Sequence, residues 1–127
     1  MGAIYTGKAL VIRQPWADLV VDGVKGIENR SWTTAYRGPL AIVAGAARDK
    51  RAHEEAEKIA REVGLDTFTP ATVYGAVVGF VDLVAIVDDL ESPWAEPGAH
   101  HWLLARPRRL NTPRPIKGRL GLFDISI

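Results

Sequence analysis

The sequence predicts an α+β fold: a small β-barrel of about five to seven strands with two or three flanking helices. Short segments rich in β-branched residues recur along the chain and are bounded by glycine or proline, as is typical of strands. Strands and helices alternate too irregularly for a doubly wound parallel sheet. The 127 residues contain no evident repeat or linker, so we expect one domain over residues 1–127.

The first third of the chain is expected to hold three strands and one short helix. Pro15 suits the first turn of that helix, and Gly23 suits its end. Branched apolar residues and the turn around Gly38 delimit the strands. The expected strands are Lys8–Arg13, Ile27–Trp32 and Leu40–Ala44, and the expected helix is Trp16–Asp22.

The segment Asp49–Val63 has the clearest helical pattern in the chain. Its apolar residues recur at three- and four-residue spacing and form one stripe. Glu54 precedes Lys58 by four residues, an order that stabilises a helix, and Gly64 follows the last turn. We assign this helix to packing and solubility and give it no chemical role.

The second half of the chain is expected to be mainly β-structure. Tyr74–Val87 is long enough for one bent strand or two, with Gly79 at the bend. Asp88–Gly98 is expected to be a loop, because it is acidic and contains two prolines. Strands are expected at His101–Arg106 and Leu120–Ile127.

Composition excludes several classes of site and of location. There is no cysteine, so disulfides and thiolate metal sites are excluded. His100 and His101 are adjacent and would face opposite sides of a strand, and the sequence indicates no metal and no cofactor. No apolar run reaches the roughly 18 residues of a membrane span. Residues 1–6 do not resemble a signal peptide, and we expect a cytoplasmic protein that does not contact membranes.

Charge is unevenly distributed although the net charge is only +1. Residues 106–119 contain six basic residues and no acid, whereas residues 82–96 contain five acids and no base. The basic run can attract phosphates or can be a solvated turn, and both interpretations are open. Lys117 and Arg119 would extend a nucleic-acid groove under the first interpretation.

The stretch from Arg13 to Arg37 concentrates the polar and aromatic residues that could carry chemistry. In an extended chain Glu28 and Arg30 lie on the same side, so they can be neighbours. Such a pair can present donors and acceptors to a flat polar ligand. The stretch contains Arg13, Gln14, Trp16, Lys25, Glu28, Asn29, Arg30, Trp32, Tyr36 and Arg37.

In this stretch the chain resembles the ASCH family, a branch of the PUA-like barrels. The resemblance rests on L-V-I-R-Q-P-W-A at residues 10–17 and on G-x-K-x-x-E-x-R at residues 23–30, followed by S-W and Y-R-G-P-L up to Leu40. It continues through G-A-V-V-G at 75–79, W-L at 102–103 and P-I-K-G at 115–118. These blocks occur in the same order over nearly the whole chain, and this makes the resemblance specific.

The resemblance implies a PUA-like barrel whose signature residues line a cleft that binds RNA, single-stranded nucleic acid or a modified nucleoside. Some members are hydrolases, one an N4-acetylcytidine amidohydrolase and another a ribonuclease. The amidohydrolase uses a lysine, a threonine three positions later and a downstream glutamate. Here Lys25 matches the lysine, but Glu28 replaces the threonine, and Glu91 and Glu96 are both candidates for the downstream acid.

Three functions therefore follow from the sequence: a nucleic-acid or nucleoside binding module, a small hydrolase using Lys25 and Glu28, and a non-catalytic protein-interaction module. Glu28 at the threonine position favours binding. The candidate ligand-binding residues are Arg13, Gln14, Trp16, Lys25, Glu28, Arg30, Trp32, Arg37, Lys117 and Arg119.

Each candidate also has a structural interpretation. Lys25 could contact a phosphate or act as a base, or it could pair with Glu28; Glu28 and Arg30 could simply brace the barrel. Trp16 and Trp32 could stack on a base or pack in the interior. Trp32 is the preferred stacking residue because its neighbours are polar, whereas Trp102 is expected in the core.

Overall fold

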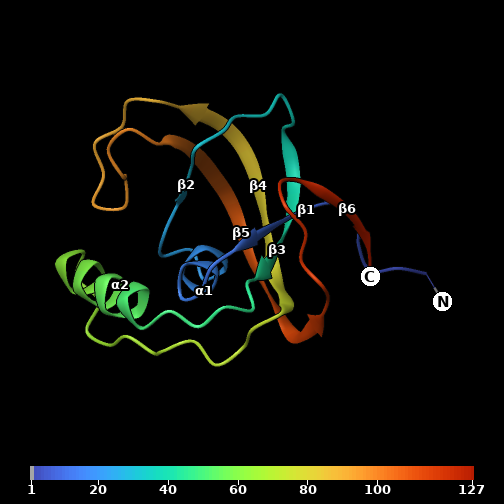
Figure 1. Cartoon of the computed structure of the whole chain (residues 1–127), viewed down its shortest axis with the longest axis horizontal. Helices are drawn as coiled ribbons and strands as arrows, with labels where there is room; N and C mark the ends of the chain where they lie inside the picture. Colours follow the sequence, from blue (N-terminus) through green and yellow to red (C-terminus); the bar gives the residue numbers. More distant parts are fainter. Residues whose placement is uncertain (1) are drawn as a thin grey trace.

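The computed structural model describes residues 2–127, which form one six-stranded sheet and two helices (Figure 1). The strand order is β2-β5-β4-β3-β1-β6. The elements are β1 (Thr6–Ile12), α1 (Trp16–Val21), β2 (Ile27–Arg30), β3 (Gly38–Ala44), α2 (Lys50–Glu62), β4 (Ala76–Val87), β5 (His100–Pro115) and β6 (Phe123–Ser126). The predicted α+β class and the predicted order of elements are confirmed.

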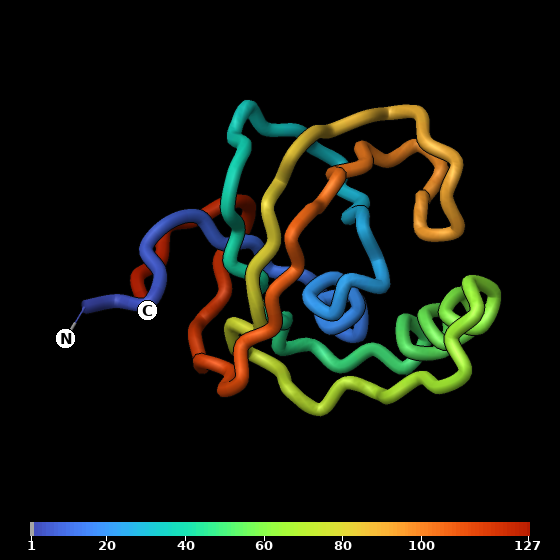
Figure 2. The backbone as a smooth tube through the Cα atoms, turned by 180° about the vertical axis from the view of Figure 1, so that it is seen from behind, coloured from blue at the N-terminus to red at the C-terminus, as the bar shows by residue number. Residues whose placement is uncertain are grey.

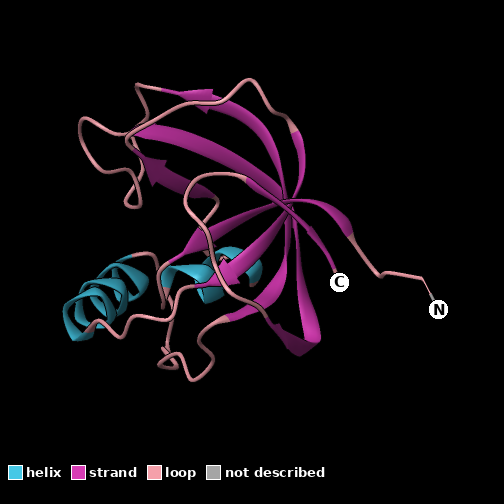
Figure 3. Cartoon of the chain, turned by 45° about the vertical axis from the view of Figure 1, so that its right-hand side comes forward, coloured by secondary structure: helices cyan, strands magenta, loops and turns pink. Residues whose placement is uncertain are grey.

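The sheet is mixed and open. β1 and β3 pair in parallel, with Leu10 opposite Ile42, and the other strand pairs are antiparallel. Within residues 2–127, β2 and β6 are the two edges and do not pair with each other, so the expectation of a closed barrel is wrong. Helix α1 packs against β1, β3, β4 and β5. Figure 3 shows the strands fanning out with both helices on one side.

Two apolar layers cover the faces of the sheet. The layer on the side of α1 contains Leu10, Leu40 and Trp102 from the strands and Val21 from α1 itself, all 2% exposed or less. Phe123 and Ile125 belong to the layer on the other face. Residues that alternate along each strand supply the two layers, as the strand pleat requires. The prediction that Trp102 lies in the core is confirmed.

Helix α2 follows the prediction closely. Its buried residues are Ala52, Ala56 and Ala60, and the Asp49 carboxylate caps the helix by accepting a hydrogen bond from the Ala52 backbone N–H at 3.0 Å. The His53 ring connects the Asp49 carbonyl to the Ala71 backbone N–H, so this histidine has a structural role. Neither helix in residues 2–127 is long and apolar enough to cross a membrane.

Strand β5 is much longer than predicted. It was expected to end at Arg106, but it continues through two prolines to Pro115 and pairs with β4 along this length. The pairing shifts register between Phe80 and Asp82, opposite Pro107, and Arg106 adopts a φ of 51°. A bulge leaves a residue outside the hydrogen-bonded ladder, so the missing N–H of Pro107 is tolerated there. Most of the basic run therefore lies on a strand.

Gly79 allows α1 and β5 to approach β4 at the bend that the sequence predicts. A Cβ atom at this position would overlap the Arg108 carbonyl oxygen and lie 2.9 Å from Val21. We expect Gly79→Ala to lower the free energy of unfolding by about 2–3 kcal/mol, because backbone cannot move aside as a side chain can. Gly26→Ala is the matched control, since nothing lies within 4 Å of its Cβ. Urea unfolding curves compare the two, and equal midpoints would contradict this packing.

Candidate functional site

A cleft of about 470 Å³ opens beside β2. Its lining comes from four stretches of chain, within residues 12–16, 25–30, 55–59 and 93–97. Figures 1 and 2 show from opposite sides that α2 and the loop between β4 and β5 project from the same side of the molecule. These two segments form opposite walls of the cleft, and β2 lies between them.

Three charged side chains of the G-x-K-x-x-E-x-R motif meet in this cleft. Lys25 Nζ lies 3.2 Å from Glu28 Oε1, and Arg30 Nη1 lies 3.2 Å from Glu28 Oε2. The Glu28 carboxylate is thus held between two cations. The side chains of Lys25 and Glu28 are 4% and 9% exposed, and that of Arg30 is 22% exposed. The prediction that Glu28 and Arg30 are neighbours is confirmed.

The backbone holds this group in place. Gly23 adopts a φ of 79° after α1, and the next two backbone N–H groups, of Val24 and Lys25, both donate to the Leu19 carbonyl. This turn directs Lys25 inward, where its Nζ also donates to the Ile27 carbonyl at 2.6 Å. Arg30 Nη1 donates in addition to the Val11 carbonyl at 3.2 Å. The motif spacing therefore follows from a glycine turn that leads into an extended strand.

Two tryptophans form an aromatic wall of the cleft. The rings of Trp16 and Trp94 meet edge to face, with centroids 6.3 Å apart and an interplanar angle of 83°. Lys25 Nζ lies 5.6 Å from the centroid of Trp16. Sequence reasoning missed Trp94, because it stands in an acidic, proline-containing loop with no hydrophobic period. A tryptophan in such a loop was the available signal.

Asn29 fastens that loop to β2. Its side-chain Nδ2 donates to the Trp94 carbonyl at 2.9 Å, and its Oδ1 accepts from the Glu96 backbone N–H at 3.1 Å. The buried His101 ring places Nδ1 2.8 Å from the same oxygen, where it must donate. Glu96 consequently lines the cleft, whereas Glu91, the other candidate acid, does not.

Trp32 and Gln14 are not where the binding prediction put them. Trp32 lies outside the cleft lining, beyond the end of β2, and packs edge to face on the core residue Trp102, with ring centroids 4.8 Å apart. Gln14 is completely buried, and its amide bonds the Val73 carbonyl and the Asp18 backbone N–H. That amide ties α1 to the segment before β4.

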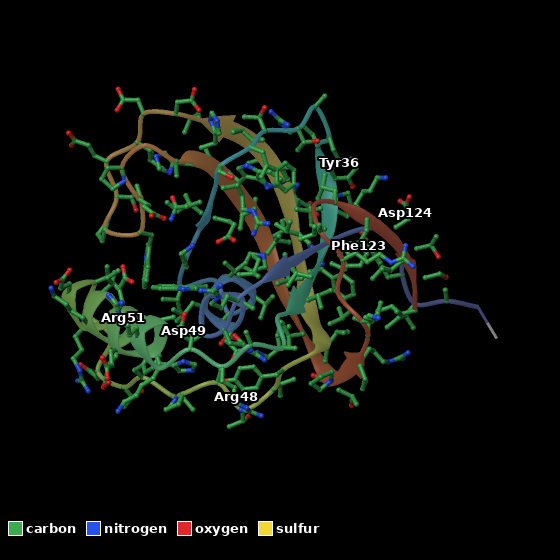
Figure 4. The ribbon with its side chains drawn as sticks, viewed as in Figure 1. Tyr36, Arg48, Asp49, Arg51, Phe123 and Asp124 are labelled. Carbon is green, nitrogen blue, oxygen red and sulfur yellow. The ribbon has the colours of Figure 1, made fainter. Side chains whose placement is uncertain are left out.

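The two arginines at the ends of the polar stretch differ in position. Arg13 lines the cleft at its rim and makes a 3.0 Å salt bridge to Asp49, which Figure 4 labels near the start of α2. Hydrogen bonds from the Ala52 backbone N–H and from Arg13 hold the pKa of Asp49 below its ordinary value. Arg37 instead donates to the Thr34 and Tyr36 carbonyls and does not line the cleft.

Half of the basic run is neutralised by acids distant in sequence. Arg106 and Arg108 both bind Asp82, and Arg109 binds Asp18 and Asp22. Burial alone would raise the pKa of Asp82, but its bonds to the two arginines outweigh burial and keep that pKa low. The remaining cations, Arg114, Lys117 and Arg119, are exposed, with no salt-bridge partner among residues 2–127.

Glu28 is the residue on which the charged group depends. We expect Glu28→Gln to lower the free energy of unfolding by about 3 kcal/mol, because it leaves two largely buried cations without their carboxylate. The control Glu54→Gln changes an exposed glutamate of α2 outside the cleft lining and should stay within about 0.5 kcal/mol of the wild type. Chemical unfolding at pH 7 measures both, and a fully stable Glu28→Gln protein would refute this role.

Comparison with known proteins agrees with this architecture. The family model described as the ASCH domain matches residues 10–114. Activating signal cointegrator 1 of Homo sapiens is 35% identical over 135 residues, and the protein of that name from Mus musculus is 50% identical over 130 residues. Each alignment covers 94% of this chain and 22% of the relative, so the chain spans about a fifth of the length of these relatives. The chain belongs to the ASCH domain family, which has a PUA-like fold.

Proposed function

We propose that this protein binds single-stranded RNA and takes one base, ordinary or modified, into the cleft beside β2. The observation that carries the proposal is the Lys25–Glu28–Arg30 group, which lies in a 470 Å³ cleft beside two tryptophan rings. Sites for small ligands are typically concave, largely apolar and supplied with a few fixed polar groups. Single-stranded bases are recognised by stacking on aromatic rings and by hydrogen bonds to their edges.

The polar groups in the cleft are suited to holding a ligand rigidly. Taking charges out of water is unfavourable unless they are paired and hydrogen-bonded, and in this group the Glu28 carboxylate pairs with both cations. No buried side-chain nitrogen or oxygen in residues 2–127 lacks a hydrogen-bond partner. Such a group needs little rearrangement when a ligand arrives, which limits the entropy that binding must offset.

Exposed cations near the cleft offer a path for phosphates. Arg13 follows the last residue of β1 and stands at the rim, where its side chain pairs with Asp49 but stays 61% exposed. Val11, two residues earlier, lies on the face of β1 opposite that of Leu10 and Ile12. A Cβ on Gly118 would lie 2.7 Å from the Val11 side chain, so the turn that carries Lys117 and Arg119 runs against that face. A strand with one base in the cleft could therefore pass Arg13 towards this turn.

Binding is proposed ahead of hydrolysis for a geometric reason. A catalytic base must have a free lone pair, and an ammonium group that pairs with a carboxylate has none. Lys25 Nζ pairs with Glu28 and also donates to the Ile27 carbonyl. The Glu28 carboxylate accepts from both cations and balances their charge. Incubation with N4-acetylcytidine and with RNA tests the alternative: turnover that disappears in Lys25→Met would replace binding by hydrolysis as the function.

Affinity for RNA should depend on salt in a measurable way. Three phosphate contacts on a single strand give a slope of log K against log salt of about −2. Replacing Lys117 and Arg119 by alanine should reduce the magnitude of the slope by about 1.4, which is two contacts. The control, Lys50→Ala with Lys58→Ala, removes two exposed cations of α2 and should leave the slope unchanged.

Fluorescence anisotropy with a labelled ten-nucleotide RNA measures these slopes. No detectable binding at low salt would refute the proposed function. An unchanged slope in the Lys117 and Arg119 double variant would remove the turn from the phosphate path and leave the cleft itself untouched.

Tryptophan fluorescence should report a base in the cleft. Stacking on Trp16 or Trp94 should quench emission when RNA is added, because both rings line the cleft. We expect Trp16→Phe and Trp94→Phe to weaken the quenching and Trp32→Phe to preserve it, since Trp32 packs on the core tryptophan Trp102. Quenching that depends on Trp32 instead would place the RNA outside the cleft.

A further inference from the structure

Hydrogen-bond donors and acceptors alternate across the Lys25–Glu28–Arg30 group. Lysine and arginine present only N–H donors, and an ionised carboxylate presents only acceptors. Because Glu28 is held between the two cations, the order across the group is donor, acceptor, donor. All three side chains line the same cleft.

Donor capacity remains on both cations. Lys25 Nζ has three N–H groups, and its bonds to Ile27 and Glu28 use two. Arg30 uses Nη1 for both of its hydrogen bonds, which leaves Nε and Nη2 without partners within residues 2–127. Since no buried polar side-chain atom in that range lacks a partner, these free arginine N–H groups are accessible.

Acceptor capacity also remains, on Glu28. Each carboxylate oxygen takes one N–H from a cation, whereas the two oxygens together can accept about four. By contrast, the Oδ1 atom of the neighbouring Asn29 already accepts from Glu96 and faces His101 Nδ1, and its Nδ2 donates to Trp94. Asn29 is therefore occupied with holding the loop, and the charged group is what faces a ligand.

Acidic side chains at the rim disfavour a phosphate in the cleft. Glu55 of α2 and Glu96 of the loop line it, and neither makes a salt bridge within residues 2–127. Arg13 is the cation at the rim, and Asp49 neutralises it. A phosphate entering between these walls would meet two unpaired carboxylates, so the part of a nucleotide that fits is its uncharged base.

We propose that the cleft selects a base with an imide edge, which is the edge that uracil and thymine share. This inference rests on the proposed function. An imide presents a carbonyl, an N–H and a second carbonyl, so its order is acceptor, donor, acceptor, the complement of the order in the cleft. Cytosine puts an amino donor where uracil has a carbonyl and would bring it against a cation. One of the two rings, Trp16 or Trp94, would stack on a face of the base, and the other, at 83° to the first, would meet the edge of the base.

Ten-nucleotide oligo-U, oligo-dT and oligo-C test the inference with unmodified protein. We expect oligo-U to bind at least about ten-fold more tightly than oligo-C, as one good two-point edge contact provides. Oligo-dT carries the same imide edge on a DNA backbone. Comparing its affinity with that of oligo-U shows whether the protein prefers RNA or DNA. Equal affinities for oligo-U and oligo-C would overturn the inference and leave the proposed function standing, whereas absence of binding to any oligonucleotide would refute the proposed function.

Modified bases test the central N–H without altering the protein. A strand with 3-methyluridine at every position lacks this hydrogen, and we expect it to bind no more tightly than oligo-C. The matched strand of 5-methyluridine keeps the imide edge, and we expect it to bind more tightly than oligo-C, as oligo-U does. A 3-methyluridine strand that binds as tightly as oligo-U would overturn the inference. In a protein variant, Glu28→Gln should narrow the preference and Glu54→Gln should preserve it, with circular dichroism used to verify that both are folded.

Discussion

The Glu28 carboxylate between Lys25 and Arg30 is the interaction on which the candidate site depends. Three charged side chains leave water together, and each is acceptable there only because the others are present. The turn after α1 and the start of β2 place these side chains together, and the Val11 carbonyl of β1 accepts a further hydrogen bond from Arg30. These contacts hold the donors and acceptors of the group in fixed orientations, as the proposed binding of a base requires.

The cleft lies at one edge of the open sheet. Strand β2 is that edge within residues 2–127, and α1 packs against β1, β3, β4 and β5. Beside β2, Asn29 holds the loop that follows β4, and Ala56 and Ala60 of α2 belong to the same apolar cluster as Trp94 and Leu19. The cleft is therefore bounded by β2, by residues 12–16, by α2 and by the loop between β4 and β5, and each of the last two contributes a glutamate without a salt bridge within residues 2–127.

Local patterns in the sequence predicted the local structure well. Branched residues located the strands, the alanine stripe located α2, and alternation along a strand correctly made neighbours of Glu28 and Arg30. What the sequence could not show is contact between distant residues. Trp94 reaches the cleft through a hydrogen bond to Asn29, 65 positions away, and the charges of Arg106 and Arg109 are cancelled by Asp82, Asp18 and Asp22. Trp32 has polar neighbours in sequence but an apolar neighbour, Trp102, in space.

A crystal structure of the protein with a short uridine-containing RNA would show whether a uracil ring occupies the cleft. We expect the ring beside Trp16 and Trp94, with its carbonyl oxygens within hydrogen-bonding distance of Lys25 Nζ and the Arg30 guanidinium. We expect the phosphates outside the rim, on the side of Arg13. An empty cleft with RNA bound elsewhere, or a phosphate bound to Lys25, would contradict this mode of binding.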